Sequence, residues 1–373
     1  MSDEAIPGQG LRFRLGRIPV SMPWSAWVGI LLIAYLWFAS FERVTETSTE
    51  ALVMAVVFAL LFYASILGHE LAHAWVARLS GNPVEGITLW GFGGYTSYER
   101  RRVTPLREGF IAASGPAITL VIGLVLRSVA ESTATIDLRV GVLVYALGIS
   151  NIYLGIFNAL PGLPLDGGAV LRSVVWAITG DQHRATIVAA WCGRVVAVGA
   201  FLWFVVPALT NGGTPDLAAV IFGAVISAWL FAGASQSLKS AQVQRRIPTI
   251  SAESLARRAV LVSPDTPLSE ALRRAQDAGV TGLVVVDAEG RPTGVARPEA
   301  VAAVPVERRP WVPVSSVSAA IAPGTVLSGG LVGGDLLAAL QAAPASQYLV
   351  VATDSSWVGV LATSDVEAAL THR

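Results

Sequence analysis

The sequence predicts an α-helical polytopic membrane protein, with about six transmembrane helices, followed by a soluble α/β domain. The composition is the first indication, because 53% of the 373 residues are hydrophobic, 14% are charged and the mean hydropathy is +0.60. Soluble globular proteins carry about 25% charged residues. The second indication is a series of uncharged runs of the roughly 20 residues that span a bilayer as helix. The third is a change after Arg246, where apolar runs become strand-sized and alternate with helical patterns.

The uncharged runs place the spanning helices in order along the chain. The first 17 residues are polar and Arg-rich rather than signal-peptide-like, so the first span is expected to remain uncleaved. A shorter amphipathic piece at residues 167–180 is expected to be re-entrant or interfacial. The predicted spans are residues 18–41, 51–68, 109–126, 140–165, 185–209 (interrupted by Arg194) and 217–238.

The short loops indicate the orientation of these spans. Basic residues cluster before the first span, between the second and third, and after the last, and all three clusters fall on one face if six helices cross the membrane. Because positive loops stay inside, both termini are expected in the cytosol and the protein in the cell membrane. The cluster residues are Arg12, Arg14, Arg17, Arg78, Arg100, Arg101, Arg102, Arg107, Lys239, Arg245 and Arg246.

Charge and cysteine content narrow the chemistry. The 26 basic and 26 acidic residues balance, so the net charge does not indicate a nucleic-acid partner. The single cysteine, Cys192, excludes an intramolecular disulfide framework and a multi-cysteine zinc site. A bound metal must therefore use His, Asp or Glu, and the chain has four histidines.

The motif His69-Glu70-Leu71-Ala72-His73 is the strongest local signal, at the end of the second apolar run. On a helix, His69 and His73 share one face and can bind one ion, while Glu70 can reach a water molecule at that ion and act as general base. Ionisable groups inside a span are costly and usually functional. The alternative is a group of solvated side chains at a helix end.

A third metal ligand is expected in the segment Asn158-Ala-Leu-Pro-Gly-Leu-Pro-Leu-Asp166-Gly-Gly. Its two prolines break the helix, and irregular backbone at membrane depth occurs only where it faces protein or a water-filled cavity. Asp166 therefore points inward and predicts, with His69 and His73, a three-ligand site with an open position. The alternative is an N-cap at the membrane edge.

These two segments resemble the signatures of the site-2 proteases, intramembrane zinc metalloproteases, in which HExxH is followed by NxxPxxPxDGG. The resemblance extends over roughly residues 14–238 and includes the Trp90–Tyr95 loop and Ser114-Gly115-Pro116. It implies one zinc ion per chain on His69, His73 and Asp166, with Glu70 as catalytic base and a broken helix near the active site. Asn158 would stabilise an oxyanion or orient the substrate.

The resemblance also implies the partner. The family cuts single-span membrane proteins such as anti-sigma factors, so a substrate of this kind is expected. The apolar, β-prone residues 86–97 are expected to present an edge strand to the unwound substrate; a plain re-entrant hairpin without substrate contact is the alternative. Arg194 is interpreted as binding a carboxylate or lipid headgroup, as snorkelling, or as part of an internal ion pair.

The chain divides by composition into a membrane domain, residues 1–246, and a cytosolic domain, residues 247–373. In the latter, two similar halves at about 251–305 and 310–370 combine helices at 268–278 and 335–342 with strands at 282–287, 293–296, 348–352 and 357–361. They resemble a pair of cystathionine β-synthase (CBS) modules. Asp365 matches an acid that binds adenine nucleotides in such modules, but Ala362, Arg297 and Ala300 replace the other expected residues. The resemblance therefore favours homodimerisation or regulation over nucleotide binding.

Two other classes of function are compatible with parts of the sequence. A CBS-regulated transporter or channel would explain Asp166 and the prolines, but gives no reason for Glu70 between two helically spaced histidines. A catalytically inactive homologue that binds membrane proteins is the other class, and the intact Glu70 argues against it.

Overall fold

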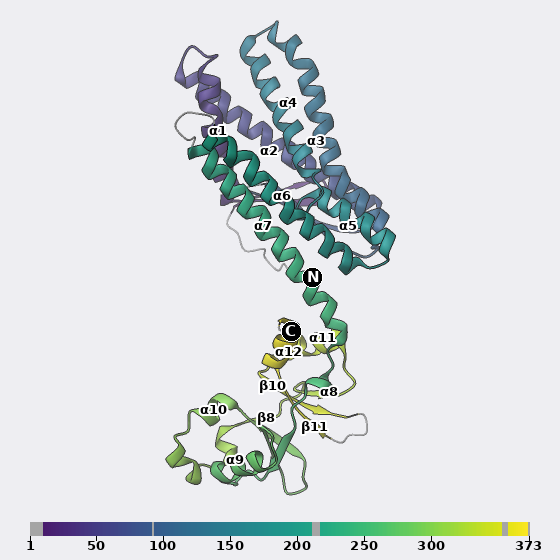
Figure 1. Ribbon diagram of the computed structural model, residues 1–373, viewed down its shortest axis with the longest axis vertical. Coiled ribbons are helices and arrows are strands. Elements are labelled where there is room, and N and C mark those ends of the chain that lie inside the picture. Colours follow the sequence, from purple (N-terminus) through teal and green to yellow (C-terminus); the bar gives the residue numbers. More distant parts are fainter. Residues whose placement is uncertain (1–9, 92, 211–216, 353–356, 372–373) are drawn as a thin grey trace. The chain divides into compact units, whose positions relative to one another are not determined.

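The computed structural model describes residues 10–91, 93–210, 217–352 and 357–371 (Figure 1). The chain forms two compact units, residues 1–241 and 242–373. The first contains the apolar helices and the second contains short strands and helices.

Six helices in the described residues are long and apolar enough to cross a membrane, which confirms the predicted polytopic fold. Large apolar side chains such as Leu31 and Trp203 are 66% and 78% exposed, so these helices present apolar surface to their surroundings, as lipid-facing helices do. The amphipathic piece is a shorter helix, α5. The helices are α1 (Trp24–Glu42), α2 (Ser48–Leu79), α3 (Pro105–Ala134), α4 (Leu138–Asn158), α5 (Asp166–Thr179), α6 (Gln182–Thr210) and α7 (Leu217–Arg246).

The beginning of the first predicted span is wrong, because residues 18–23 form a strand. β1 (Gly10–Leu15) and β2 (Ile18–Pro23) pair as an antiparallel hairpin, and α1 starts only at Trp24. Pro19 and Pro23 explain the difference, since proline cannot donate the backbone hydrogen bond that a helix interior needs. β2 also pairs with β3 (Val84–Trp90), in parallel, and β3 pairs with β4 (Gly93–Tyr98), antiparallel. The order β1-β2-β3-β4 makes β4 an edge strand.

The fourth predicted span is also shorter than expected, because α4 ends at Asn158 and residues 159–165 are not helical. Neighbouring helices enclose this connecting loop. The Leu163 N–H donates to the Ala189 carbonyl of α6 at 3.0 Å. A Cβ added at Gly193 of α6 would overlap the Leu163 carbonyl, and one at Gly233 of α7 would lie 2.7 Å from Pro164. Glycines therefore let both helices approach the loop that leads to Asp166.

The second unit repeats one β-α-β-β-α order, which contains the predicted helix and strand pair of each half and adds a last helix that was not predicted. In the first half, β5 (Ala259–Val262), α9 (Leu268–Asp277), β6 (Gly282–Val286), β7 (Pro292–Ala296) and α10 (Pro298–Ala302) follow one another, and β8 (Ser318–Ala320) extends the sheet to β5-β6-β7-β8. The second half has β9 (Val326–Ser328), α11 (Gly333–Ala342), β10 (Gln347–Val351), β11 (Trp357–Ala362) and α12 (Thr363–Thr371), with sheet order β11-β10-β9. A short helix, α8 (Ala252–Leu255), precedes both.

Candidate metal centre

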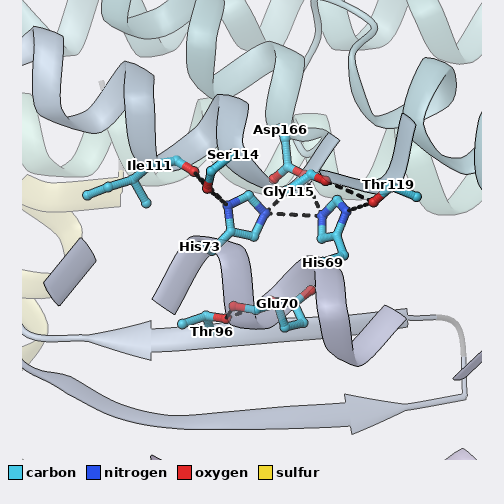
Figure 2. A network of polar contacts seen from close by, with 9 residues as sticks. All are labelled: His69, Glu70, His73, Thr96, Ile111, Ser114, Gly115, Thr119 and Asp166. Carbon is cyan, nitrogen blue, oxygen red and sulfur yellow. Dashed lines mark hydrogen bonds and ion pairs between the residues drawn. The ribbon is translucent and has the colours of Figure 1, made fainter. Parts of the chain in front are cut away.

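The three predicted metal ligands meet between α2 and the start of α5 (Figure 2). The Nε2 atoms of His69 and His73 lie 3.1 Å apart, and the Asp166 Oδ2 atom lies 2.9 Å from the first and 3.3 Å from the second. Both histidines are buried, whereas the Asp166 side chain is 26% exposed. The group is therefore closed on the α2 side and open at the aspartate.

The outer ring nitrogens determine the tautomers of both histidines. His73 Nδ1 lies 2.7 Å from the Ile111 carbonyl, which can only accept, so this nitrogen carries a hydrogen. His69 Nδ1 lies 2.9 Å from the Thr119 hydroxyl, which donates its own hydrogen to the Gly115 carbonyl at 2.8 Å. Thr119 therefore accepts from His69 Nδ1–H. In the neutral rings both Nε2 lone pairs then face Asp166.

The donor set fits a zinc ion. Two imidazole lone pairs and a carboxylate oxygen, all acceptors, repel one another at 2.9–3.3 Å unless a cation or protons lie between them. Ligand atoms on one face of a tetrahedral zinc site, with bonds of about 2.0–2.1 Å, lie roughly 3.3 Å apart. A Cβ added at Gly115 would overlap both Nε2 atoms, so this glycine leaves room beside them.

Asp166 reaches the centre because the preceding loop turns the chain back toward α2. It is the first residue of α5, and Gly167 and Gly168 follow it. A Cβ at Gly167 would overlap the Ala159 carbonyl, and one at Gly168 would overlap the backbone of Gly162 and Leu163. The two glycines are therefore required where α5 packs against the loop.

Glu70 is held by the edge strand. The Thr96 hydroxyl on β4 lies 2.7 Å from Glu70 Oε2 and 3.0 Å from the Glu70 carbonyl oxygen, and Glu70 is 5% exposed. A Cβ at Gly94 would lie 2.7 Å from Glu70 Cγ, so this strand position must be glycine for the carboxylate to pack there. Figure 2 shows the side chain of Glu70 beside Thr96, while the neighbouring imidazoles point toward Asp166.

Among the described residues, no hydrogen bond joins the other predicted site residue, Asn158, to His69, Glu70, His73 or Asp166. Asn158 is the last residue of α4 and is half-buried. Its catalytic role stays a prediction. Of the remaining histidines, His183 is in the first turn of α6, and His372 lies outside the described residues.

Sequence reasoning missed the residues that support the ligands. They are Thr119 and the Ile111 carbonyl on α3, Gly115 between the two imidazoles, and Thr96 on β4. Only one signal pointed toward them, the Ser114-Gly115-Pro116 segment, because a small residue followed by proline in an apolar helix indicates close packing. A carbonyl that accepts from an imidazole leaves no mark in a sequence.

Comparisons with known proteins identify the family of this chain. The sequence profile of Peptidase family M50 matches residues 57–133 and 128–202, a stretch that contains the histidines, Glu70 and Asp166. A Synechocystis protein named as a candidate zinc metalloprotease, sll0528, is 32% identical over 275 residues, which cover 71% of this chain and 69% of that protein. The chain belongs to Peptidase family M50, the site-2 proteases.

Two further matches cover smaller parts of the chain. A Mycobacterium tuberculosis protein named as a candidate zinc metalloprotease, Rip3, is 44% identical over 142 residues, or 38% of this chain and 36% of that protein. The solved site-2 protease from Methanocaldococcus jannaschii aligns over 61% of this chain and 95% of its own, with 23% identity and a TM-score of 0.42. In the second unit, the CBS domain profile matches residues 252–304.

Proposed function

We propose that this M50 protein is an intramembrane zinc metalloendopeptidase that cuts a single-span membrane protein within or near its transmembrane segment. The observation that carries the proposal is the convergence of Asp166, at the start of α5, with His69 and His73. The two histidines and the neighbouring Glu70 lie on α2, a helix apolar enough to span the bilayer. An ion-permeation site would also need ligands for an ion. It would give no reason for a second carboxylate, Glu70, that lies beside the ligands and is held by a hydrogen bond from Thr96.

A zinc ion bound there would act as a Lewis acid, polarising the scissile carbonyl and making a water molecule acidic near neutral pH. Glu70 accepts the proton of the attacking water and returns it to the leaving amine. Thr96 holds one carboxylate oxygen, Oε2, and so fixes the direction of the other. Thr119 and the Ile111 carbonyl keep both imidazoles in the tautomer that offers Nε2.

The edge strand β4 is the proposed binding place of the substrate backbone. A peptide bond inside a helix is hydrogen-bonded and inaccessible, so the substrate must unwind before it is cut. β4 is hydrogen-bonded to β3 on one side, and its residues Gly94 and Thr96 contact Glu70. An extended substrate added to the other side of β4 would place its backbone next to the proposed base.

Replacing Glu70 with glutamine tests the proposal, because it removes the base and leaves the three ligands in place. Purified Glu70→Gln is expected to retain about one zinc per chain and to leave a co-expressed single-span substrate uncut. Glu99→Gln is the matched control, since Glu99 is 50% exposed and pairs with Arg101. Cleavage by Glu70→Gln at the wild-type rate would contradict the assigned base, and wild type without cleavage would support an inactive homologue.

We further propose that the protein resides in the cell membrane with both termini cytosolic, and that its CBS pair mediates homodimerisation. The acid expected to contact a nucleotide, Asp365, instead accepts a hydrogen bond from Arg257. This contact supports a scaffold without adenine nucleotide. AMP and ATP are therefore expected to leave the thermal stability of the purified protein unchanged, and a dose-dependent rise would contradict the proposal.

Membrane proteomics of wild type against Glu70→Gln would identify the substrate, including any anti-sigma factor.

A further inference from the structure

Arg194 is a charged residue on the apolar helix α6, and its side chain contacts α7. Its Nε and Nη2 atoms donate to the Ser235 hydroxyl of α7 at 3.2 and 3.1 Å. Its guanidinium carbon lies 4.7 Å from the Trp191 ring centre and 5.2 Å from that of Phe231. The guanidinium is thus fixed by one hydroxyl and two aromatic faces, which compensate only part of its charge.

No carboxylate of the described residues forms an ion pair with Arg194, although arginines on α3, α4 and α5 each have one. Arg127 pairs with Glu131, Arg139 with Glu46 and Glu50, and Arg172 with Glu108. A guanidinium has five N–H donors, and the Ser235 contacts use two of its nitrogens. The remaining donors can therefore bind an external anion.

Ser235 indicates the depth of this arginine. Upstream of Ser235, α7 is apolar, whereas Ser235, Gln236, Ser237 and Lys239 begin a polar stretch that continues to Arg246. α7 therefore leaves the hydrocarbon near Ser235, at the level of one layer of lipid headgroups. Lys239 follows Ser235 by four residues, on the same face of the helix, and is exposed. Two cations thus lie within about one helical turn.

An apolar stripe extends from this position along α6. Trp191, Val195, Val198 and Leu202 follow the i, i+4, i+7, i+11 pattern and are 55%, 70%, 52% and 51% exposed. The stripe runs away from the polar end of α7, because α6 and α7 are antiparallel neighbours with Arg194 against Ser235 (Figure 1). A phosphate next to Arg194 and Lys239 would therefore have an acyl-sized apolar surface beside it.

We propose that Arg194 and Lys239 form a binding site for the phosphate of an anionic phospholipid, whose acyl chain lies along the α6 stripe. The charge favours a lipid with a net negative headgroup over a zwitterionic one, whose own ammonium group would compete for the phosphate. The site lies on α6 next to Gly193, which packs against the loop leading to Asp166.

Native mass spectrometry of the full chain, released from an equimolar mixture of phosphatidylglycerol and phosphatidylcholine, tests the proposal. Wild type is expected to retain phosphatidylglycerol in preference. Arg194→Gln and Lys239→Gln should each lower that preference about fivefold, the effect of one basic residue at an anionic surface. Arg127→Gln is the matched control, because Arg127 also stacks on an aromatic ring, that of Tyr145, but has Glu131 as its partner. Equal retention by wild type and both test variants would overturn the site.

The only lysine of the chain offers a second measurement. Lys239 is the only lysine in the sequence, so its labelling by an amine reagent can be followed by peptide mapping. Phosphatidylglycerol nanodiscs are expected to slow this labelling relative to phosphatidylcholine nanodiscs, and Arg194→Gln should remove the difference. If inorganic phosphate protects Lys239 in phosphatidylcholine nanodiscs as well as phosphatidylglycerol does, the ligand is a free anion and the lipid assignment is wrong.

Discussion

At the scale of single residues, the centre depends on which nitrogen of each imidazole carries its hydrogen. Thr119 is fully buried and has one hydrogen to donate, which goes to the Gly115 carbonyl. Its oxygen is therefore left to accept from His69, whose Nε2 then offers its lone pair to the ion. Such outer partners orient a metal ligand and raise its basicity.

Thr119→Val is expected to weaken zinc binding about 10- to 100-fold, because valine keeps the shape and removes the acceptor. Competition with a chromogenic chelator measures the affinity. Thr119→Ser should restore most of it. Thr133→Val is the control, since Thr133 lies on the same helix but donates to the Val129 and Ala130 carbonyls. Unchanged affinity in Thr119→Val would exclude the proposed tautomer control.

Gly115→Ala is expected to abolish stoichiometric zinc binding, because the added methyl group would occupy the space beside both Nε2 atoms. Elemental analysis of the purified variant measures this loss. Gly68→Ala provides the comparison: Gly68 precedes His69, but its added Cβ would lie 3.9 Å from the Ile122 Cδ1 atom, an ordinary contact. Full zinc content in Gly115→Ala would mean that the metal is bound elsewhere.

At the scale of elements, the loop between α4 and α5 connects helix packing to the metal centre. α6 and α7 approach this loop through Gly193 and Gly233, and the loop delivers Asp166. Gly193→Val is expected to destabilise the protein by about 1–3 kcal/mol, as overpacking does, and to lower zinc content because the Asp166 loop must move. Thermal unfolding in detergent and elemental analysis check both effects. Gly199→Val, on the same helix with open space around its Cβ, should change neither; equal effects in the two variants would refute the coupling.

Most helices and strands could be predicted, because the length of the apolar runs and their periodicity indicate them. The apolar runs indicated the six helices, and the two strand pairs of the second unit begin within a residue of the predicted positions. The hairpin of β1 and β2 was missed because its residues 18–23 adjoin an apolar helix without a change in hydropathy. The ligand set was suggested by motif spacing, whereas its supporting contacts join residues 38 and 50 positions apart and depend on packing alone.

At the scale of the whole molecule, one chain combines a unit of apolar helices suited to a lipid bilayer with a second unit of short strands and helices. The membrane unit places acidic and basic side chains inside apolar helices, where each needs a partner. For His69, His73 and Asp166 the proposed partner is a zinc ion, which would bind the three inner ligand atoms while hydrogen bonds to Thr119 and Ile111 use the outer nitrogens of the two imidazoles. The proposed proteolysis therefore depends on metal binding at this one place.

X-ray absorption at the zinc edge of the purified full-length protein tests this claim most directly. The account predicts about one zinc per chain, with only nitrogen and oxygen neighbours at about 2.0–2.1 Å and a multiple-scattering signature of two imidazoles. The signature should be lost when His69 and His73 are both replaced by alanine. A sulfur neighbour from Cys192, the single cysteine of the chain, would contradict the account. An unchanged spectrum in the double variant would contradict it as well.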